Sequence, residues 1–434
     1  MKSKSLPSKE ETLNGLMSFV QDSPTPFHAT ANLVRMFQTK GFQPLYETDP
    51  WKLELGKSYY VTRNDSAIVA FRCGTQAPAE SGIRMAGAHT DSPCLKLKPL
   101  PELKFGPYQQ WGVEIYGSVL LSTWFDRQLS LAGRVFYRTK DGRRRSTLID
   151  FKRALASIPN LAIHLNRDAN EGRKINKQGE LSPLVAQVAA GRDNLSLNLL
   201  LAEEIQKTTG ETAETVLDWE LSFYDVHTPS RWGWKGEFFS SARLDNLISC
   251  YIGALGLIES GPGQNAVFIG NDHEEVGSAS TTGAQGSFLK DVISRWIPNH
   301  EDFVRAAQNS LFLSTDNAHG VHPNYADRHD GQHAPLLNLG PALKINANQR
   351  YATNSETGAY LIDLAMRNEI PLQKFVSRND MPCGSTIGPI TATELGIKTA
   401  DLGVPTFAMH SIRETGGTDD PHHLLRLLLA FYTS

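Results

Sequence analysis

Four short apolar runs of this chain each lead directly into side chains of the kind that bind metal ions. They are residues 82–88 before His89, 266–270 before Asn271-Asp272-His273-Glu274-Glu275, 311–315 before Asp316, and 405–409 before His410. Continuous apolar runs are expected of strands that are covered on both faces. In open α/β sheets, ligands bind outside the carboxyl ends of the strands. We therefore expect these side chains to converge on one crevice of an α/β domain.

The patterns around these runs indicate how the chain is divided. Ser8 and Glu11 form a capping box before a helical stripe, and residues 242–259 carry a strong 3.6-residue apolar period. Residues 59–63 and 67–72 predict a hairpin. Between about 95 and 240 the sequence pattern predicts mainly strands, at residues 113–115, 118–121, 134–137 and 219–226. Because 434 residues exceed the usual size of one core, we predict an α/β domain (1–95 and 241–434) interrupted by a β-rich domain (96–240).

Charge, apolar runs and cysteines limit the compartment and the classes of partner. The net charge is −3, so no basic field indicates nucleic acid or an anionic membrane. No apolar stretch reaches the roughly 20 residues of a membrane helix, and residues 1–9 are too polar for a signal peptide. The cysteines (Cys73, Cys94, Cys250 and Cys383) are scattered without a CxxC pair, which fits a reducing compartment. We expect a cytoplasmic protein that binds neither nucleic acid nor a membrane.

The residue types that follow the four runs suit zinc. Imidazoles and carboxylates are zinc ligands, and no cysteine cluster indicates a structural thiolate site. A fifth candidate, Asp245, lies in the first turn of the 242–259 helix, where it is placed to bridge two ions about 3.5–4 Å apart. The candidate ligands are His89, Asp245, Glu275, Asp316 and His410. Their three carboxylates do not cancel the charge of two zinc ions, so the ions would remain electrophilic.

Two further acids accompany this set. Glu274 stands beside a candidate ligand and fits a general base for hydrolysis, and Asp91 is placed to accept the other N–H of His89. Each position taken singly also fits a solvated loop residue, and only the combination points to metal. Competing patterns are incomplete, since position 277 is glycine where H-E-x-x-H needs histidine, and Ser385 lacks a G-x-S-x-G elbow. The sequence has no Walker loop and no G-x-G-x-x-G fingerprint.

Five segments, in order along nearly the whole chain, resemble the aspartyl aminopeptidase family, which also includes yeast vacuolar aminopeptidase I. They are Ala88-His89-Thr90-Asp91-Ser92-Pro93, Arg243-Leu244-Asp245-Asn246, Asp272-His273-Glu274-Glu275-Val276-Gly277, Asp316-x-x-His319-x-x-His322-Pro323-Asn324-Tyr325 and Met409-His410-Ser411-Ile412-Arg413-Glu414. The resemblance implies a zinc-peptidase-like mixed sheet flanked by helices, with an inserted β-rich dimerisation domain. It also implies homodimers that build a tetrahedral homododecamer around the active sites.

The resemblance also implies roles for individual residues. The five candidate ligands match the ligands of two zinc ions per subunit, Glu274 matches the general base, and Asp91 matches the residue that orients His89. His164 matches a histidine that enters the neighbouring subunit's active site, where it would donate to a developing oxyanion. From its residue type alone, His164 fits a satisfied histidine at a strand end, and direct zinc ligation is a third possibility.

Three more residues bear on substrate. Lys344 matches a lysine that faces an acidic side chain of the substrate, and His319 and Tyr351 are assigned to substrate binding. The implied activity is removal of N-terminal residues from peptides, with a preference for Asp or Glu. Asn348 stands where animal members tend to carry another lysine, so a neutral, Leu-type preference is an alternative. The same residues also fit a related hydrolase acting on C-terminal residues or acylated amines, and a non-catalytic oligomeric binding protein.

Overall fold

The computed structural model describes residues 6–188 and 194–434, and the chain falls into two compact units. Unit 1 comprises Met1–Asp91, Pro229–Met409 and Glu414–Ser434, and unit 2 comprises Ser92–Thr228 and His410–Arg413. The assignment of a catalytic and a dimerisation domain, with limits at residues 95 and 241, stays a prediction.

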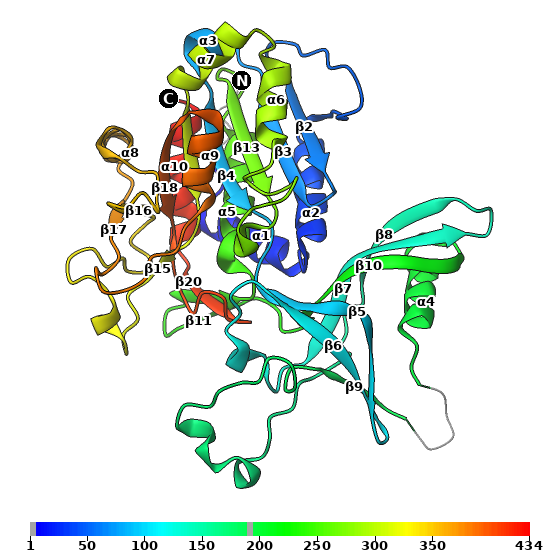
Figure 1. The fold of residues 1–434 in the computed structure, drawn as a ribbon. Coiled ribbons are helices and arrows are strands. Elements are labelled where there is room, and N and C mark those ends of the chain that lie inside the picture. The colour runs from blue at the N-terminus through cyan, green and yellow to red at the C-terminus, as the bar shows by residue number, and fades with distance from the viewer. Residues whose placement is uncertain (1–5, 189–193) are drawn as a thin grey trace. The chain divides into compact units, whose positions relative to one another are not determined.

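A nine-stranded mixed sheet forms the centre of unit 1 (Figure 1). Its three neighbouring strands β13, β4 and β14 run parallel to one another, and they come from three of the four apolar runs. The hairpin predicted at 59–72 is present as the antiparallel pair β2 and β3. In spatial order the strands are β1 (Gln43–Pro44), β2 (Ser58–Arg63), β3 (Ala67–Arg72), β13 (Ala266–Asn271), β4 (Arg84–His89), β14 (Leu311–Thr315), β18 (Lys398–Gly403), β16 (Ala342–Lys344) and β17 (Gln373–Phe375).

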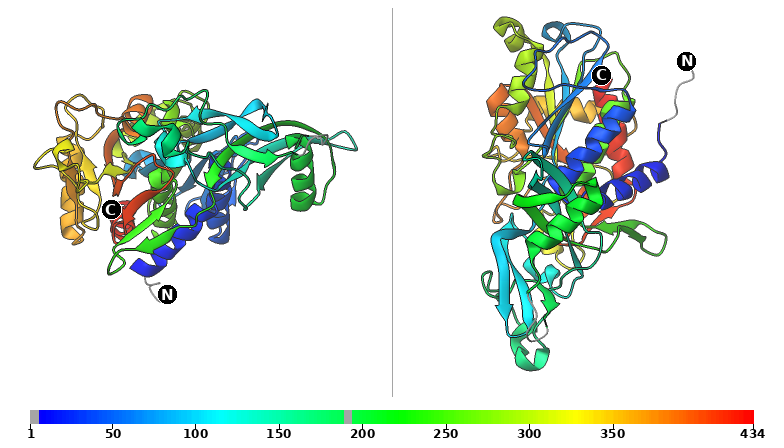
Figure 2. Two further views of the ribbon diagram at one scale, coloured as in Figure 1. Left: turned by 90° about the horizontal axis from the view of Figure 1, so that it is seen from below. Right: turned by 90° about the vertical axis from the view of Figure 1, so that its right-hand side faces the viewer.

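Helices cover both faces of this sheet (Figure 2). Alternate strand residues point to opposite faces, so Ile68 and Ala70 join one apolar core while Val69 and Phe71 join the other. One face is covered by α1 (Lys9–Gln21), α2 (Pro26–Thr39), α5 (Leu244–Glu259), α8 (Ser355–Arg367) and α10 (Asp420–Tyr432). The other is covered by α6 (Phe288–Trp296), α7 (His300–Asn309) and α9 (Ile387–Leu395), and the short α3 (Pro78–Ser81) packs beside α7. The predicted α/β class is thereby confirmed.

The start of the first helix follows the sequence signal closely. α1 begins after Ser8, whose hydroxyl accepts the N–H of Glu11 at 3.2 Å while the Glu11 carboxylate accepts the N–H of Ser8 at 2.8 Å. This reciprocal pair satisfies two donors that the first turn of a helix leaves without intrahelical partners. The capping box predicted from the sequence is therefore present.

The fourth apolar run, predicted as a strand over 405–409, is a strand only in its first part and lies outside the nine-stranded sheet. Only Pro405–Phe407 is extended, as β19 of a separate sheet, and Ala408 has a φ of 54° that ends the strand. A short apolar run carries no information about which sheet it will join, because that depends on long-range pairing. This five-stranded sheet consists of β11 (Ser230–Trp232), β12 (Phe238–Ser241), β20 (Glu414–Gly417), β19 and β15 (Ala318–His319).

Unit 2 is built on a six-stranded sheet in which every neighbouring pair is antiparallel. The predicted strand at 118–121 is wrong, since Gly117 (φ 73°) ends β6 and residues Leu121–Trp124 form a 3₁₀ turn. The strands in spatial order are β8 (Arg144–Asp150), β7 (Leu129–Thr139), β10 (Ala213–Asp225), β5 (Cys94–Phe105), β6 (Tyr108–Tyr116) and β9 (Leu184–Gln187), and α4 (Leu197–Thr209) packs on β10.

Across the two described stretches of chain, every helix is too short or too polar to span a lipid bilayer.

Candidate metal centre

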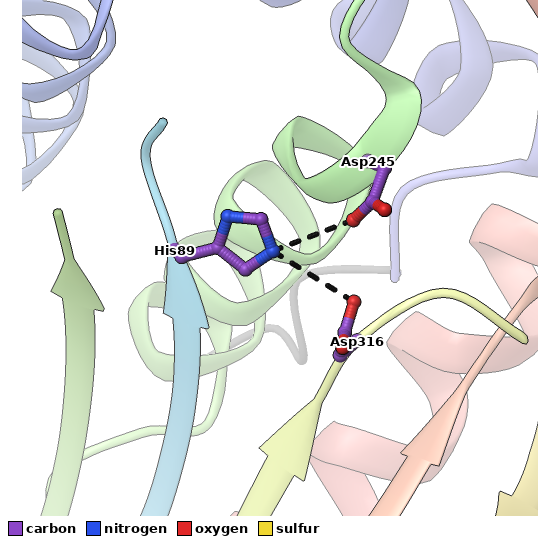
Figure 3. A group of neighbouring side chains, drawn as sticks. All are labelled: His89, Asp245 and Asp316. Carbon is purple, nitrogen blue, oxygen red and sulfur yellow. Dashed lines mark ion pairs between the residues drawn. The ribbon is translucent and has the colours of Figure 1, made fainter. Parts of the chain in front are cut away.

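Unit 1 brings three of the predicted ligands together at the carboxyl ends of its parallel strands (Figure 3). His89 is the last residue of β4, Asp316 follows β14, and Asp245 lies in the first turn of α5. Nε2 of His89 lies 3.4 Å from Oδ1 of Asp245 and 3.8 Å from Oδ1 of Asp316. Because β4 and β14 are parallel neighbours, their ends meet at one edge of the sheet.

The ring of His89 is oriented by Asp91. Its Nδ1 lies 3.0 Å from the carbonyl oxygen of Asp91 and 3.3 Å from the carboxylate Oδ1 of the same residue. Both oxygens only accept, so Nδ1 carries a proton and Nε2 is the nitrogen that faces the carboxylates. Such an arrangement fixes the tautomer that a metal-binding histidine requires.

Asp91 also holds the backbone that carries the two glutamates. The N–H groups of Glu274 and Glu275 donate to its Oδ1 and Oδ2, each at 3.1 Å, in a 3₁₀ turn at Glu274–Val276 that follows β13. Oε2 of Glu274 lies 3.9 Å from Nε2 of His89, and side-chain atoms of Glu274, Glu275 and His89 form a second candidate metal-binding group. One buried carboxylate therefore positions a candidate ligand and the candidate base.

The start of α5 is fixed by Glu414, a residue that the sequence patterns did not assign. Oε2 of this buried glutamate accepts the N–H of Asp245 at 2.9 Å, and the amide of Asn246 donates to the carbonyl of Thr315 at 2.8 Å. Together these bonds hold the first turn of α5 against the end of β14. The only sequence signal was an acid at the end of the segment 409–414, which by itself fits a surface residue.

The cluster carries a concentration of negative charge. Burial lowers the pKa of His89, but hydrogen bonds to Asp245, Asp316 and Asp91 raise it well above its usual value. Burial also raises the pKa of Glu274, and the nearby carboxylates raise it further while His89 opposes the shift. The pKa values of His89 and Glu274 are raised because the buried carboxylates around them are not balanced by positive charge. A bound cation would supply that charge.

The donor set fits zinc. Zinc takes nitrogen and oxygen ligands at about 2.0–2.2 Å, so neighbouring ligand atoms of a tetrahedral site are about 3.4 Å apart. The separations of 3.4 and 3.8 Å between Nε2 of His89 and the oxygens of Asp245 and Asp316 are close to that value. These residues can therefore hold zinc after only small side-chain movements.

The fifth predicted ligand, His410, belongs to unit 2. Its Nδ1 donates to the carbonyl oxygen of Ser118 at 3.0 Å, and its backbone carbonyl accepts the N–H of Leu120. The Nδ1 bond fixes the ring tautomer with a lone pair on Nε2, as a zinc ligand requires. The role of His410 as a ligand stays a prediction.

His164 lies in a 3₁₀ turn of unit 2, Ile163–Leu165, rather than at a strand end. Its side chain is exposed, and so are the neighbouring apolar side chains of Leu161, Ile163 and Leu165. Unit 2 therefore presents this histidine on an exposed apolar segment, and its catalytic role stays a prediction.

Lys344 is a buried residue of β16. Its side chain is 3% exposed, its Nζ lies 3.5 Å from Oδ2 of Asp316, and it faces the ring of Tyr351 at 5.3 Å from the centroid. Tyr351 is itself buried. The ammonium group thus adjoins the candidate metal ligands, although its contact with a substrate is a prediction.

His319 lines a cavity of about 280 Å³ in unit 1. Its ring packs against Phe375 with centroids 6.0 Å apart, and desolvation and the positive charge of Lys344 lower its pKa. The imidazole is therefore neutral at physiological pH and can both donate and accept. The cavity is also lined by His322, Arg378, Met381, Phe407 and Met409.

Comparisons with known proteins point to one family. The family model described as "Aminopeptidase I zinc metalloprotease (M18)" matches residues 19–432. A probable M18 family aminopeptidase 2 of Pseudomonas savastanoi pv. phaseolicola is 56% identical over 426 residues, which are 98% of this chain and 99% of that protein. The counterpart in Stutzerimonas stutzeri is 54% identical with the same coverage.

Solved structures extend this similarity to the fold. Ape4, in a cryo-EM structure of its complex with Nbr1, is 38% identical with a TM-score of 0.93, covering 99% of this chain and 88% of Ape4. Mature Ape1 of Saccharomyces cerevisiae, solved as a dodecamer, is 26% identical with a TM-score of 0.85, covering 98% of this chain and 96% of Ape1.

Proposed function

Because the chain belongs to the M18 family of aminopeptidase I zinc metalloproteases, we propose that it cleaves N-terminal residues from peptides at a two-zinc site that prefers acidic residues. That it is a zinc-dependent aminopeptidase follows from the family. The finer points, which are the second ion, the roles of single residues, the substrate preference and the assembly, are proposals.

One observation carries the proposed site: Nε2 of His89 faces three carboxylate oxygens within 4 Å while Asp91 holds Nδ1. His89, Asp245, Glu275, Asp316 and His410 would hold the two ions, with Asp245 shared between them. Five ligands with a total charge of −3 suit two dications better than one, since a single ion would leave buried negative charge uncompensated.

Different residues of the chain are proposed for the separate steps of hydrolysis. Zinc, when bound, supplies a Lewis acid that polarises the scissile carbonyl and acidifies water. Glu274 takes the proton from the attacking water and returns it to the leaving amine. Asp91 keeps this base in place through the backbone of residues 274 and 275. His164, if supplied by a neighbouring subunit, donates to the developing oxyanion.

The acidic preference rests on Lys344. A desolvated ammonium group attracts a substrate carboxylate more strongly than a hydrated one does. Asp316 already contacts one side of this ammonium group, so the carboxylate of an acidic substrate and that of Asp316 would both interact with Lys344. His319, whose pKa is lowered by the charge of Lys344, and Tyr351, whose ring faces Lys344, are proposed as the other walls of the substrate site.

The assembly and the compartment are proposed from the relatives and the composition. The solved dodecamer of yeast Ape1 supports a homododecamer built from dimers, and an oligomer is needed if His164 acts in a neighbouring active site. The scattered cysteines support a cytoplasmic location.

A peptide panel combined with metal analysis tests the proposed function. We expect about two zinc ions per chain, cleavage of peptides with a free N-terminus, no cleavage of the same peptides after N-acetylation, and faster cleavage of Glu- and Asp- than of Leu-initiated peptides. One zinc per chain would remove the two-ion proposal. Faster cleavage of Leu-initiated peptides would favour the neutral alternative.

A further inference from the structure

Asp401 is a buried acid in β18, next to the proposed substrate site, to which the mechanism above gives no role. Its side chain is 0% exposed. Oδ1 accepts the hydroxyl of Thr386 at 2.5 Å, and Oδ2 accepts the backbone N–H of Ala352 at 2.6 Å. A buried carboxylate is costly unless its oxygens receive such donors. These two bonds therefore tie two loops to the central sheet.

The two loops form the surroundings of Tyr351. Ala352 is the next residue after Tyr351, and Thr386 caps the start of α9 by accepting the N–H of Gly388 at 3.2 Å. A Cβ atom at Gly388 would overlap both carboxylate oxygens of Asp401, so this position has no room for a side chain. The carboxylate therefore has little room to move, and it holds the 351–353 segment together with the bonds between the Thr353 hydroxyl and the backbone of Asp401.

Lys344 is the residue of β16 that pairs with Asp401 across the sheet. Its buried ammonium group needs opposite charge nearby. Asp316 supplies one such charge at 3.5 Å, but the other oxygen of Asp316 faces His89 in the metal cluster. Asp401 lies opposite Lys344 on the neighbouring strand, and the charge of Lys344 counteracts the rise in the pKa of Asp401 that burial causes.

We propose that Asp401 is a positioning residue for substrate selectivity, which holds Tyr351 and Lys344 where they meet the side chain of the substrate's N-terminal residue. The proposal rests on the proposed function for the location of the substrate site. It does not depend on which side chain the enzyme prefers, because a displaced Lys344 and Tyr351 would change the ratio of rates for charged and apolar N-terminal residues in either case.

The substitution Asp401→Asn tests this role, since the amide cannot accept on both sides. Loss of one hydrogen bond to a charged group predicts that KM for a Glu-initiated peptide rises about tenfold, while KM for the Leu-initiated peptide and kcat for both stay within about twofold. Zinc content should equal that of the wild type. A purely structural role would instead lower the active fraction and reduce both rates equally.

Two further variants keep the test decisive if Asp401→Asn does not fold. Thr386→Val removes one donor to the carboxylate, and the exposed Thr393→Val on the same helix is its matched control. We expect Thr386→Val, but not Thr393→Val, to change the Glu-to-Leu ratio of kcat/KM at least about threefold. An unchanged ratio in Thr386→Val, or equal losses on both substrates, overturns the proposal. If the wild type prefers Leu, the acidic preference fails, and the change of ratio still decides the role of Asp401.

Discussion

The nine-stranded sheet of unit 1 and the six-stranded sheet of unit 2 end their strands in different ways. In unit 1, β13, β4 and β14 are parallel neighbours, and their carboxyl ends carry the Glu274–Glu275 turn, His89 and Asp316 at one edge. In unit 2 every neighbouring pair is antiparallel, so consecutive strand ends lie at opposite edges. Parallel pairing thus gathers polar side chains from distant parts of a chain, and antiparallel pairing separates them.

The two units also differ in the surroundings of their candidate functional histidines, His89 in unit 1 and His164 in unit 2. His89 is buried, with both ring nitrogens facing acidic groups of unit 1. His164 is exposed on a 3₁₀ turn between exposed apolar side chains. The role of His89 can be tested within one chain, whereas the proposed action of His164 in a neighbouring active site also needs a test that combines chains.

Glu274→Gln should have the largest effect. The amide keeps the shape of the side chain but cannot take a proton, so kcat should fall about 100- to 10,000-fold. Zinc content, measured by elemental analysis, should not change, because Glu274 is not assigned as a ligand. The exposed Glu80→Gln on α3 is the matched control and should retain wild-type rates. Turnover near the wild-type rate would show that another group is the base.

His164→Ala should lower kcat about 100-fold, because an oxyanion donor is worth that much or more. Zinc content and oligomer size, measured by elemental analysis and light scattering, should not change. The exposed His227→Ala in unit 2 is the control.

Mixed oligomers separate action in a neighbouring site from action within the same chain. Co-expressed His164→Ala and Glu274→Gln chains should recover activity, since some sites then combine an intact Glu274 with an intact His164 from the neighbour. A mixture as inactive as either variant alone contradicts the proposed action of His164 in trans.

Lys344→Met should lower kcat/KM for Glu-initiated peptides about 10- to 100-fold, which corresponds to the loss of one desolvated charge pair. Cleavage of Leu-initiated peptides should change much less. The exposed Lys398→Met on β18, whose ammonium pairs with Glu356, is the matched control. Because Lys344 contacts Asp316, zinc content is measured in the same samples. Equal losses on both substrates would assign Lys344 to the metal centre alone.

The smallest expected effect concerns Asp420, at the start of α10. Burial raises its pKa to about 7, against the N–H groups of Asn338 and Gly340 that donate to it. The folded state therefore binds this proton more tightly than the unfolded state, so the stabilisation is present below about pH 4 and is lost as pH rises through 7. Between pH 5 and 8 the free energy of unfolding should fall by about 3 kcal/mol from this group.

Urea denaturation at pH 5 and pH 8 measures this dependence, and Asp420→Asn should remove it. Asp141→Asn in unit 2 is the control, because hydrogen bonds from Arg143 and Thr139 lower the pKa of Asp141 to about 2. Its contribution is complete above the usual carboxyl pKa and does not vary between pH 5 and 8. The same pH slope in the wild type and in Asp420→Asn would show that Asp420 is not the group responsible.

Much of unit 1 could be predicted from local patterns. The capping box at Ser8, the hairpin at 59–72 and the strands at 84–89, 266–271 and 311–315 all follow from signals within a few residues. The strand at 118–121 and the place of the run 405–409 could not, because a positive φ and long-range strand pairing overrode the apolar pattern. Glu414 and Asp401 were missed for a related reason. An acid looks the same in the sequence whether it is solvated or buried against a backbone N–H.

The sequence by itself determined the types of residue and their order: apolar runs that stop at His89, Asp316 and the acidic turn at 274–275, in a chain that matches one family from 19 to 432. Only the tertiary structure decided which of these side chains meet. Strand order and direction placed three run ends at one edge and moved the fourth run to another sheet. Those choices depend on contacts between residues hundreds of positions apart, whose energy no local pattern contains.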